Sequence, residues 1–172
     1  MTTLYDLTFP TLIAALKTEQ SLLEKAETFA TEKGTPITEL LEARLAPDMW
    51  ALSQQITITA LHATMTVLKL TGKEGNKVEF GPADLETTKK YLTETLATLA
   101  AVKPEDVNSK EATIVTAMMG PNFNPEMKAV DYVQGYLLPN VFFHVTTLYD
   151  ILRSKGLDLG KKDFLGGFIK LA

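Results

Sequence analysis

The chain has 172 residues, 45% of them hydrophobic, which suits a single globular domain over residues 1–172 that buries a core without covalent links. It has no cysteine, which excludes disulfides, thiolate metal sites and cysteine nucleophiles and favours an intracellular compartment. Its 21 acidic and 17 basic residues give a formal net charge of -4 without any run of Lys or Arg, so we expect no nucleic-acid partner.

The first half of the chain predicts two long helices. The N-terminus lacks a basic stretch followed by an apolar one, and no apolar run is long enough to span a membrane, so we expect a cytoplasmic protein without membrane contact. Residues 9–33 carry apolar side chains at helical spacing, with Pro10 tolerated in the first turn and Gly34 as the stop. A short connector over residues 37–45 leads to a second helix over residues 47–70.

The second half predicts two further helices and an irregular crossing between them. A third helix covers residues 82–102, after which the helical period is lost. Residues 112–116 are typical of a strand, so a short β-hairpin or a covering loop is expected there. The last helix, residues 131–155, contains Pro139, which should kink or divide it. The apolar tail, residues 156–172, should pack back across the bundle or against a second subunit.

Four long amphipathic helices of this kind predict a mainly α fold, an antiparallel four-helix bundle. The chain has only two histidines, His62 in the middle of the second helix and His144 in the middle of the last. Two side chains at the middle of bundle helices can converge on one interior site. One interpretation is a polar pocket or a metal site with both histidines as nitrogen ligands. The other is two histidines that are hydrogen-bonded in the core or at a subunit contact.

A metal site is the weaker form of the first interpretation. Two ligands are too few for tight binding, and no second histidine four residues away and no His-x-x-Glu pattern supplies more. Tyr136, Tyr149 and Asp150 are further candidates, because a phenol or a carboxylate near an imidazole forms an acid–base pair. Asp150 lies on a different helix face from the histidine and is more typical of a surface ion pair. Of the pair Gln54 and Gln55, one amide can turn into the bundle.

A longer motif gives the chain a family resemblance. Residues 139–153 read P-N-x-x-F-H-x-T-T-x-Y-D-I-L-R, and residues 160–166 read G-K-K-D-F-L-G. The second helix adds matching residues at Pro47-Asp48-Met49, Gln54-Gln55, His62-Ala63 and Leu70-Thr71-Gly72. Over most of its length the chain therefore resembles the domain-of-unknown-function family DUF1993. That family resembles an outlying branch of the DinB/YfiT-like superfamily, which implies a DinB-like four-helix bundle.

The resemblance also implies possible ligands. Members of the superfamily often bind a divalent metal through one histidine on the second helix and a His-x-x-x-His pair on the last. Many are dimers, and some are thiol-dependent transferases or isomerases. By this resemblance His62 matches the ligand on the second helix and His144 matches the second histidine of the pair. Asn140 stands where the family carries the first histidine, so the resemblance implies at most a weaker Ni or Zn site, completed by an amide oxygen.

We therefore predict a pocket lined by Gln55, His62, Asn140 and His144 that binds a small organic molecule. If the protein is an enzyme, His144 is the first candidate for acid–base catalysis of the isomerase or transferase type, and Tyr149 is the second. Two alternatives stay open: a non-catalytic binding or dimeric interaction protein with structural histidines, and a divalent-metal-dependent transferase or hydrolase with His62 and His144 as ligands. The resemblance implies a homodimer.

Overall fold

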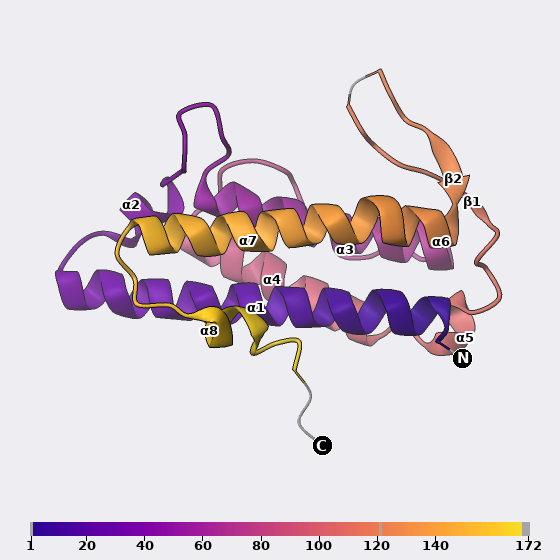
Figure 1. Cartoon of the computed structure of the whole chain (residues 1–172), viewed down its shortest axis with the longest axis horizontal. Coiled ribbons are helices and arrows are strands. Elements are labelled where there is room, and N and C mark those ends of the chain that lie inside the picture. Colours follow the sequence, from indigo (N-terminus) through magenta and orange to yellow (C-terminus); the bar gives the residue numbers. More distant parts are fainter. Residues whose placement is uncertain (1, 121, 170–172) are drawn as a thin grey trace.

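Four long helices form a bundle that makes up most of the molecule (Figure 1). The computed structural model describes residues 2–120 and 122–169. The long helices are α1 (Leu4–Lys33), α3 (Leu52–Thr71), α4 (Leu85–Ala100) and α7 (Leu138–Ser154). Short helical segments connect or flank them: α2 (Ile37–Leu41), α5 (Pro104–Val107), α6 (Ala129–Tyr132) and α8 (Lys161–Leu165). The predicted mainly helical bundle is confirmed, and none of the described helices is both long and apolar enough to cross a membrane.

The four helices do not simply alternate in direction. Helix α3 packs on α4 and α7, and α1 packs on the same two helices. The loop after α3 runs back along the bundle: its Asn76 accepts a hydrogen bond from Thr98 near the end of α4, and its Ala83 N–H donates to Ser53 near the start of α3. Helix α4 therefore runs in the same direction as α3. The predicted antiparallel arrangement holds for α3 with α7 and for α1 with α4, but the returning loop makes α3 and α4 parallel.

The helix ends differ from the predictions by a few residues. Helix α1 begins at Leu4 rather than at residue 9, because a reciprocal capping box with Thr3 as the N-cap closes its first turn. Pro10 consequently lies in the second turn and not in the first. Helix α3 begins at Leu52 rather than at residue 47, because the Gln54 side chain accepts a backbone N–H just before this point. Helix α4 is also shorter than predicted at both ends.

The last long helix accommodates Pro139 with a π-helical turn. Residues Val133–Leu137 form this turn, η1, and the Leu138 N–H bonds to the Val133 carbonyl five residues earlier. Pro139 has no N–H to donate to the Gly135 carbonyl, so a regular α-helical ladder would be broken at this point in any case. The chain continues from α6 through η1 into α7, and the helix is not divided at the proline.

A β-hairpin precedes this helix. Strand β1 (Ile114–Thr116) pairs with β2 (Glu126–Lys128) in antiparallel register, with Val115 opposite Met127. The hairpin predicted near residues 112–116 is confirmed, although its strands are short. The loop between β1 and β2 rises from one end of the bundle (Figure 1).

The tail after α7 packs back on α1. The Thr18 hydroxyl donates to the Phe164 carbonyl at 3.2 Å, and Lys25 Nζ lies 2.8 Å from an Asp163 carboxylate oxygen. These contacts confirm the prediction that the tail crosses the bundle. Residues 170–172, which the prediction also included, lie outside the described residues.

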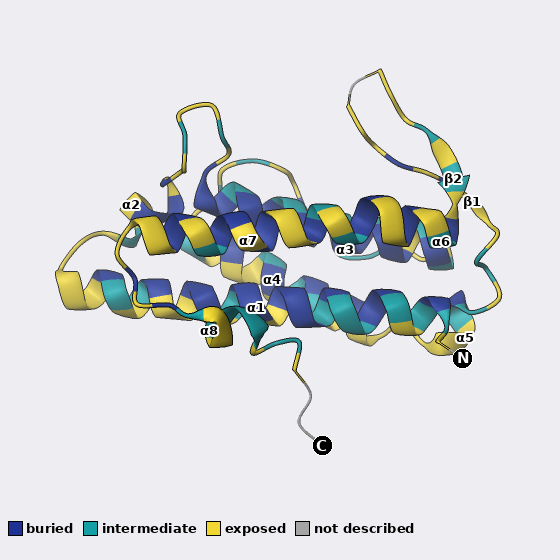
Figure 2. Ribbon diagram, in the orientation of Figure 1, coloured by how far each residue is buried: buried dark blue, intermediate teal, exposed yellow. Residues whose placement is uncertain are grey.

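Buried residues line the inner faces of the long helices (Figure 2). One acidic residue, Glu19 of α1, lies among them with its side chain fully buried. Among the described residues, neither carboxyl oxygen of Glu19 has a hydrogen-bond partner. Burial raises the pKa of Glu19 well above its usual range, and the Thr59 hydroxyl opposes this shift with a smaller effect. The folded state therefore favours the protonated form of this carboxyl group.

Candidate functional site

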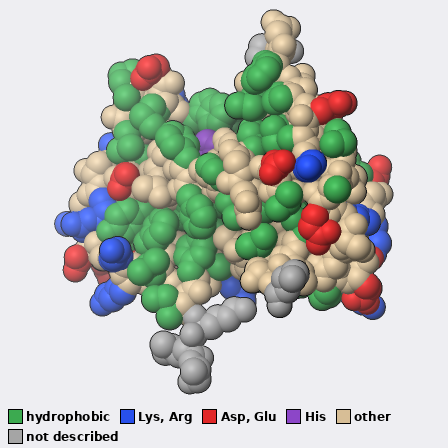
Figure 3. Space-filling view, turned by 45° about the vertical axis from the view of Figure 1, so that its right-hand side comes forward, with side chains coloured by type: hydrophobic (Ala, Val, Ile, Leu, Met, Phe, Trp, Pro, Cys, Tyr) green, Lys and Arg blue, Asp and Glu red, His purple; other side chains and the backbone are tan. Residues whose placement is uncertain are grey.

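A pocket of about 440 Å³ opens between α3 and the last helix. Figure 3 shows a histidine at the bottom of this hollow, between two raised parts of the surface and bordered by hydrophobic side chains. The lining comes from both helices and from two loops, and it consists of Trp50, Ile58, Leu61, His62, Met65, Lys69, Met118, Met119, Gly120, Tyr132, Tyr136, Asn140 and His144. An apolar wall with a few convergent polar groups is the usual composition of a small-molecule site.

Sequence spacing explains why these residues meet. On α3, His62 and Lys69 are seven residues apart, which places them on one face about two turns apart. The last helix contributes four pocket residues at a spacing of four, namely Tyr132, Tyr136, Asn140 and His144. In a regular α-helix, residues four apart are rotated by about 40°, so such a row would turn away from the pocket. The π turn contains about one residue more than an α-helical turn. It therefore compensates for this rotation and keeps both tyrosines on the pocket side.

Gln55 fixes the orientation and the protonation of His144. The His144 Nδ1 and Gln55 Oε1 atoms are 2.7 Å apart, and Gln55 Nε2 donates to the Trp50 carbonyl at 2.9 Å. That second bond identifies the amide nitrogen, so the Gln55 oxygen can only accept, and His144 carries its proton on Nδ1. The Nε2 atom of His144 is therefore an unprotonated acceptor. The Trp50 ring stacks on the imidazole at a centroid distance of 5.6 Å.

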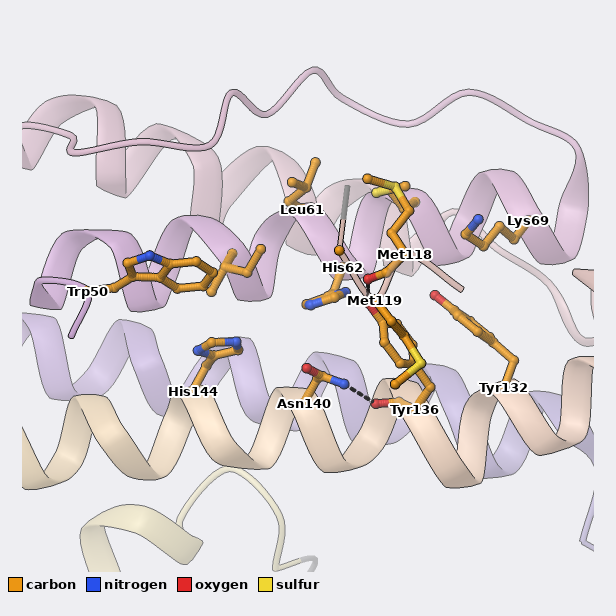
Figure 4. Close-up of a pocket in the computed structure, with 13 residues that line it drawn as sticks. Trp50, Leu61, His62, Lys69, Met118, Met119, Tyr132, Tyr136, Asn140 and His144 are labelled. Atoms are coloured by element: carbon orange, nitrogen blue, oxygen red, sulfur yellow. Dashed lines mark hydrogen bonds between the residues drawn. The ribbon is translucent and has the colours of Figure 1, made fainter. Parts of the chain in front are cut away.

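His62 lies beside His144 with a ring-centroid distance of 6.3 Å (Figure 4). Its ring has no hydrogen-bond partner among the described residues. Its nitrogens are not fully buried, and the side chain lines the pocket, so a ligand can reach them. Burial lowers the pKa of His62 to about 4. Burial, and then the neighbouring His62, lower the pKa of His144 to about 4. Both rings are neutral at neutral pH, so each has one nitrogen that donates and one that accepts.

Asn140 and the tyrosines complete the polar lining. Asn140 Nδ2 donates to the Tyr136 carbonyl at 2.7 Å, which leaves the amide oxygen as an acceptor (Figure 4). The Tyr136 hydroxyl donates to the Met118 carbonyl and ties the hairpin loop to the helix. Burial raises the pKa of Tyr132 to about 12 and raises that of Tyr136 as well. The phenols therefore stay protonated and act as fixed aromatic walls.

The donor set of this pocket does not fit a divalent cation. Besides His62 and His144, the lining offers the Asn140 amide oxygen but no carboxylate or thiolate. In the part of the chain that the structure describes, no three His, Cys, Asp or Glu side chains are grouped as metal ligands. The Lys69 ammonium group lines the same pocket and would repel a cation. Zinc and nickel sites in proteins are built from more and stronger donors, so the predicted His62–His144 metal site gains no support from its surroundings.

The structure brings the four predicted pocket residues together. His62, Asn140 and His144 line the pocket. Gln55 is not part of this lining, but it holds His144 in place through the hydrogen bond to Nδ1. Tyr149, the second candidate for catalysis, is not placed near them. Its hydroxyl donates to the Leu159 carbonyl at 3.2 Å and its ring packs edge-on against a phenylalanine of the tail. This position separates Tyr149 from the histidines.

Trp50, Lys69 and Tyr132 are pocket residues that the sequence analysis did not predict. The signal for Lys69 was its spacing of seven from His62, and the signal for Tyr132 was its spacing of twelve from His144. Trp50 had no such signal, because it lies in an irregular segment where a helix was predicted.

Comparison with known proteins agrees with this architecture. A family model described as a domain of unknown function (DUF1993) matches residues 4–165. The crystal structure of a DinB family member protein from Shewanella denitrificans is similar, with 28% sequence identity and a TM-score of 0.85 over 98% of this chain and 95% of that chain. No curated protein matches the chain. The predicted DinB-like fold is thereby confirmed.

Proposed function

This chain belongs to the DUF1993 family, and we propose that it binds a small organic molecule between α3 and α7 and performs acid–base chemistry on it with His62 and His144. The observation that carries this proposal is the Gln55–His144 hydrogen bond, which leaves an unprotonated Nε2 beside His62, whose ring has no hydrogen-bond partner in the described part of the chain. A histidine oriented by its other nitrogen is a typical general base. Most buried polar side-chain atoms have a hydrogen-bond partner, either a protein group or an ordered water, so ring nitrogens that face a pocket without a protein partner are suited to bind a ligand.

In the proposed reaction His144 Nε2 accepts a proton from the carbon next to a carbonyl group of the bound molecule. The electron pair of the broken C–H bond moves to the carbonyl oxygen, to which His62 donates an N–H hydrogen bond. In a molecule with a C=C double bond next to the deprotonated carbon, the His144 imidazolium then returns the proton to the far carbon of that double bond. The double bond moves by one position, so the reaction is an isomerisation that needs no oxidant or reductant. The low pKa of His144 keeps the base free at neutral pH, and negative charge developing on the ligand stabilises the imidazolium during transfer.

Methyl hexyl ketone is a suitable probe, because it is apolar, neutral and has exchangeable protons next to its carbonyl. The chain has two histidines, so labelled imidazole rings give two NMR signals, and we expect both signals to shift and to saturate as the ketone is added. In D2O the protein should accelerate exchange of these protons. His144→Leu should abolish the acceleration, whereas Tyr149→Phe, a change outside the pocket, should leave it intact.

The outcomes separate the candidate functions. Shifts of both signals without accelerated exchange would support a non-catalytic binding protein and reject the acid–base role. No shift of either signal would show that the ketone does not bind beside the histidines and would count against the acid–base role. Stoichiometric binding of Zn²⁺ or Ni²⁺ that moves both histidine signals would favour the metal-dependent alternative. The homodimer and the cytoplasmic location stay predictions, and sedimentation of the purified chain tests the first.

A further inference from the structure

A positive charge lies at the end of the pocket opposite Trp50. Lys69, in the last turn of α3, lines the pocket and donates from Nζ to the Thr116 carbonyl at 2.6 Å. Within residues 2–120 and 122–169, no carboxylate oxygen lies within the 4.0 Å that defines an ion pair with this nitrogen. The sequence has 21 acidic residues and an excess of negative charge, yet none of the described ones is placed beside Lys69.

An ordinary explanation for Lys69 is a cation that stabilises the C-terminal end of α3 and holds the hairpin. The carbonyl of Thr116 uses only one of the three N–H donors of the ammonium group. Lys73, just beyond the same helix end, already provides a positive charge and is paired with Asp106 at 2.6 Å. Burial lowers the pKa of Lys69, so its place in the pocket is unfavourable for the charge unless an anion joins it.

The pocket wall between the two ends is a continuous row of aromatic rings. Trp50 stacks on His144, and His62 follows at 6.3 Å from His144. Tyr136 then lies 5.7 Å from His62 and 5.5 Å from Tyr132. Lys69 Nζ is 5.9 Å from the centroid of the Tyr132 ring, at the end of this row. Figure 4 shows the same order from Trp50 to Lys69.

The spacing along α3 gives the scale of a ligand that would reach both ends. His62 and Lys69 are seven residues apart, which corresponds to roughly 10 Å along the helix axis. The space between them is lined by apolar atoms of Met118, Met119 and Tyr136. Only an elongated molecule with an apolar middle would contact the imidazoles and the ammonium group at once.

We propose that the ligand of this pocket is an elongated apolar molecule that carries a carboxylate, and that Lys69 binds this carboxylate roughly 10 Å from the imidazole pair. This inference rests on the proposed function, because it assigns the class of molecule that the same pocket takes. The carboxylate accepts hydrogen bonds from the remaining N–H donors of Lys69, and the apolar part of the ligand lies along the aromatic row. The reacting group of the ligand then lies between His62 and His144.

Octanoate and octanamide test this assignment, because they share shape and length but differ in charge. We expect the purified protein to bind octanoate about tenfold more tightly than octanamide, the factor given by about 1.4 kcal/mol, with shifts of both histidine signals. Lys69→Met should remove the preference, and Lys69→Arg should retain it. Lys73→Met removes the same charge close by but outside the pocket, and it should leave the preference unchanged.

Equal binding of octanoate and octanamide by the unaltered protein would overturn the carboxylate site and leave the proposed function standing, since octanamide would still occupy the pocket. The assignment to Lys69 would also be wrong if Lys73→Met and Lys69→Met reduced the preference equally, because the effect would then be general electrostatic attraction. If octanoate, octanamide and methyl hexyl ketone all failed to shift the histidine signals, both proposals would fall. The comparison of the two probes needs no variant, so it holds even if Lys69→Met does not fold.

Discussion

Replacing His144 by Leu should change how the stability of the protein depends on pH. In the folded state burial, together with His62, lowers the pKa of His144 from 6.5 to about 4. A depressed folded-state pKa means that the contribution to stability is present above pH 6.5 and is lost as the pH falls toward 4. At about 1.4 kcal/mol per pKa unit, the loss attributable to His144 is about 3 kcal/mol. His62, with its pKa also lowered to about 4, adds a loss of similar size.

The variant isolates the share of His144. At pH 7.5 we expect His144→Leu to be less stable by about 1–3 kcal/mol, because the Gln55 oxygen is left buried without its donor. Near pH 4 this difference should vanish or reverse. The unaltered protein is destabilised there because His144 is protonated more readily in the unfolded chain, and the variant has no titrating group at this position. Urea denaturation at several pH values between 7.5 and 4 measures the free energy of unfolding of the unaltered protein and of the variant. Groups that titrate equally in the two proteins drop out of the difference between these free energies.

Thr147→Val is the matched control, because Thr147 is buried on the same helix but does not titrate. Its effect on the free energy of unfolding should be the same at every pH. If the difference between the unaltered protein and His144→Leu were equally constant from pH 7.5 to pH 4, His144 would not be held neutral by burial. The account of the general base would then lose its physical basis.

Three other predictions concern the core, the tail and the stacked ring. Because the raised pKa of Glu19 stabilises the fold only at low pH, Glu19→Gln should be more stable than the unaltered protein at pH 7.5, with the gain disappearing below about pH 4; a loss at pH 7.5 in urea denaturation would contradict this. Gly167→Ala should destabilise the fold by about 1–3 kcal/mol, because its Cβ would clash with the Ala14 carbonyl oxygen, whereas Gly81→Ala has free space and should show little change in thermal unfolding. The fluorescence of Trp50, the single tryptophan, should titrate with a midpoint near pH 4 through its stacked His144; a midpoint near 6.5 would disagree.

The sequence predicted the helical bundle and the two histidines of the site for a simple reason. Apolar periodicity is a property of each helix by itself, and the chain has two histidines, each in the middle of a long helix. Their convergence follows from the antiparallel packing of α3 on α7, in which Gln55 meets His144 and Thr66 meets Tyr132. The resemblance to a known family drew attention to Asn140, which lines the same pocket as the two histidines.

Features that depend on loops were not predictable in this way. The direction of α4 is set by the path of residues 72–84 back along the bundle, and loop composition does not specify such a path. Trp50 reaches His144 from an irregular segment that Pro47 and Asp48 made look like a helix start. Glu19 was missed for another reason, since it occupies an apolar position of α1 between Leu16 and Leu23, where a buried acid is rare.

The π turn before Pro139 accommodates the equivalent of one residue inserted into an α-helix. Deleting one residue within Val133–Leu137 would restore regular α geometry and leave Tyr132 eleven residues before His144, which corresponds to a rotation of only about 20°. Tyr132 would then keep its place on the pocket wall, and so would Asn140 and His144. The helix can therefore lose one codon at this point with both ends of the pocket still on one face, whereas a deletion in a regular part of the helix would rotate one end by about 100° relative to the other.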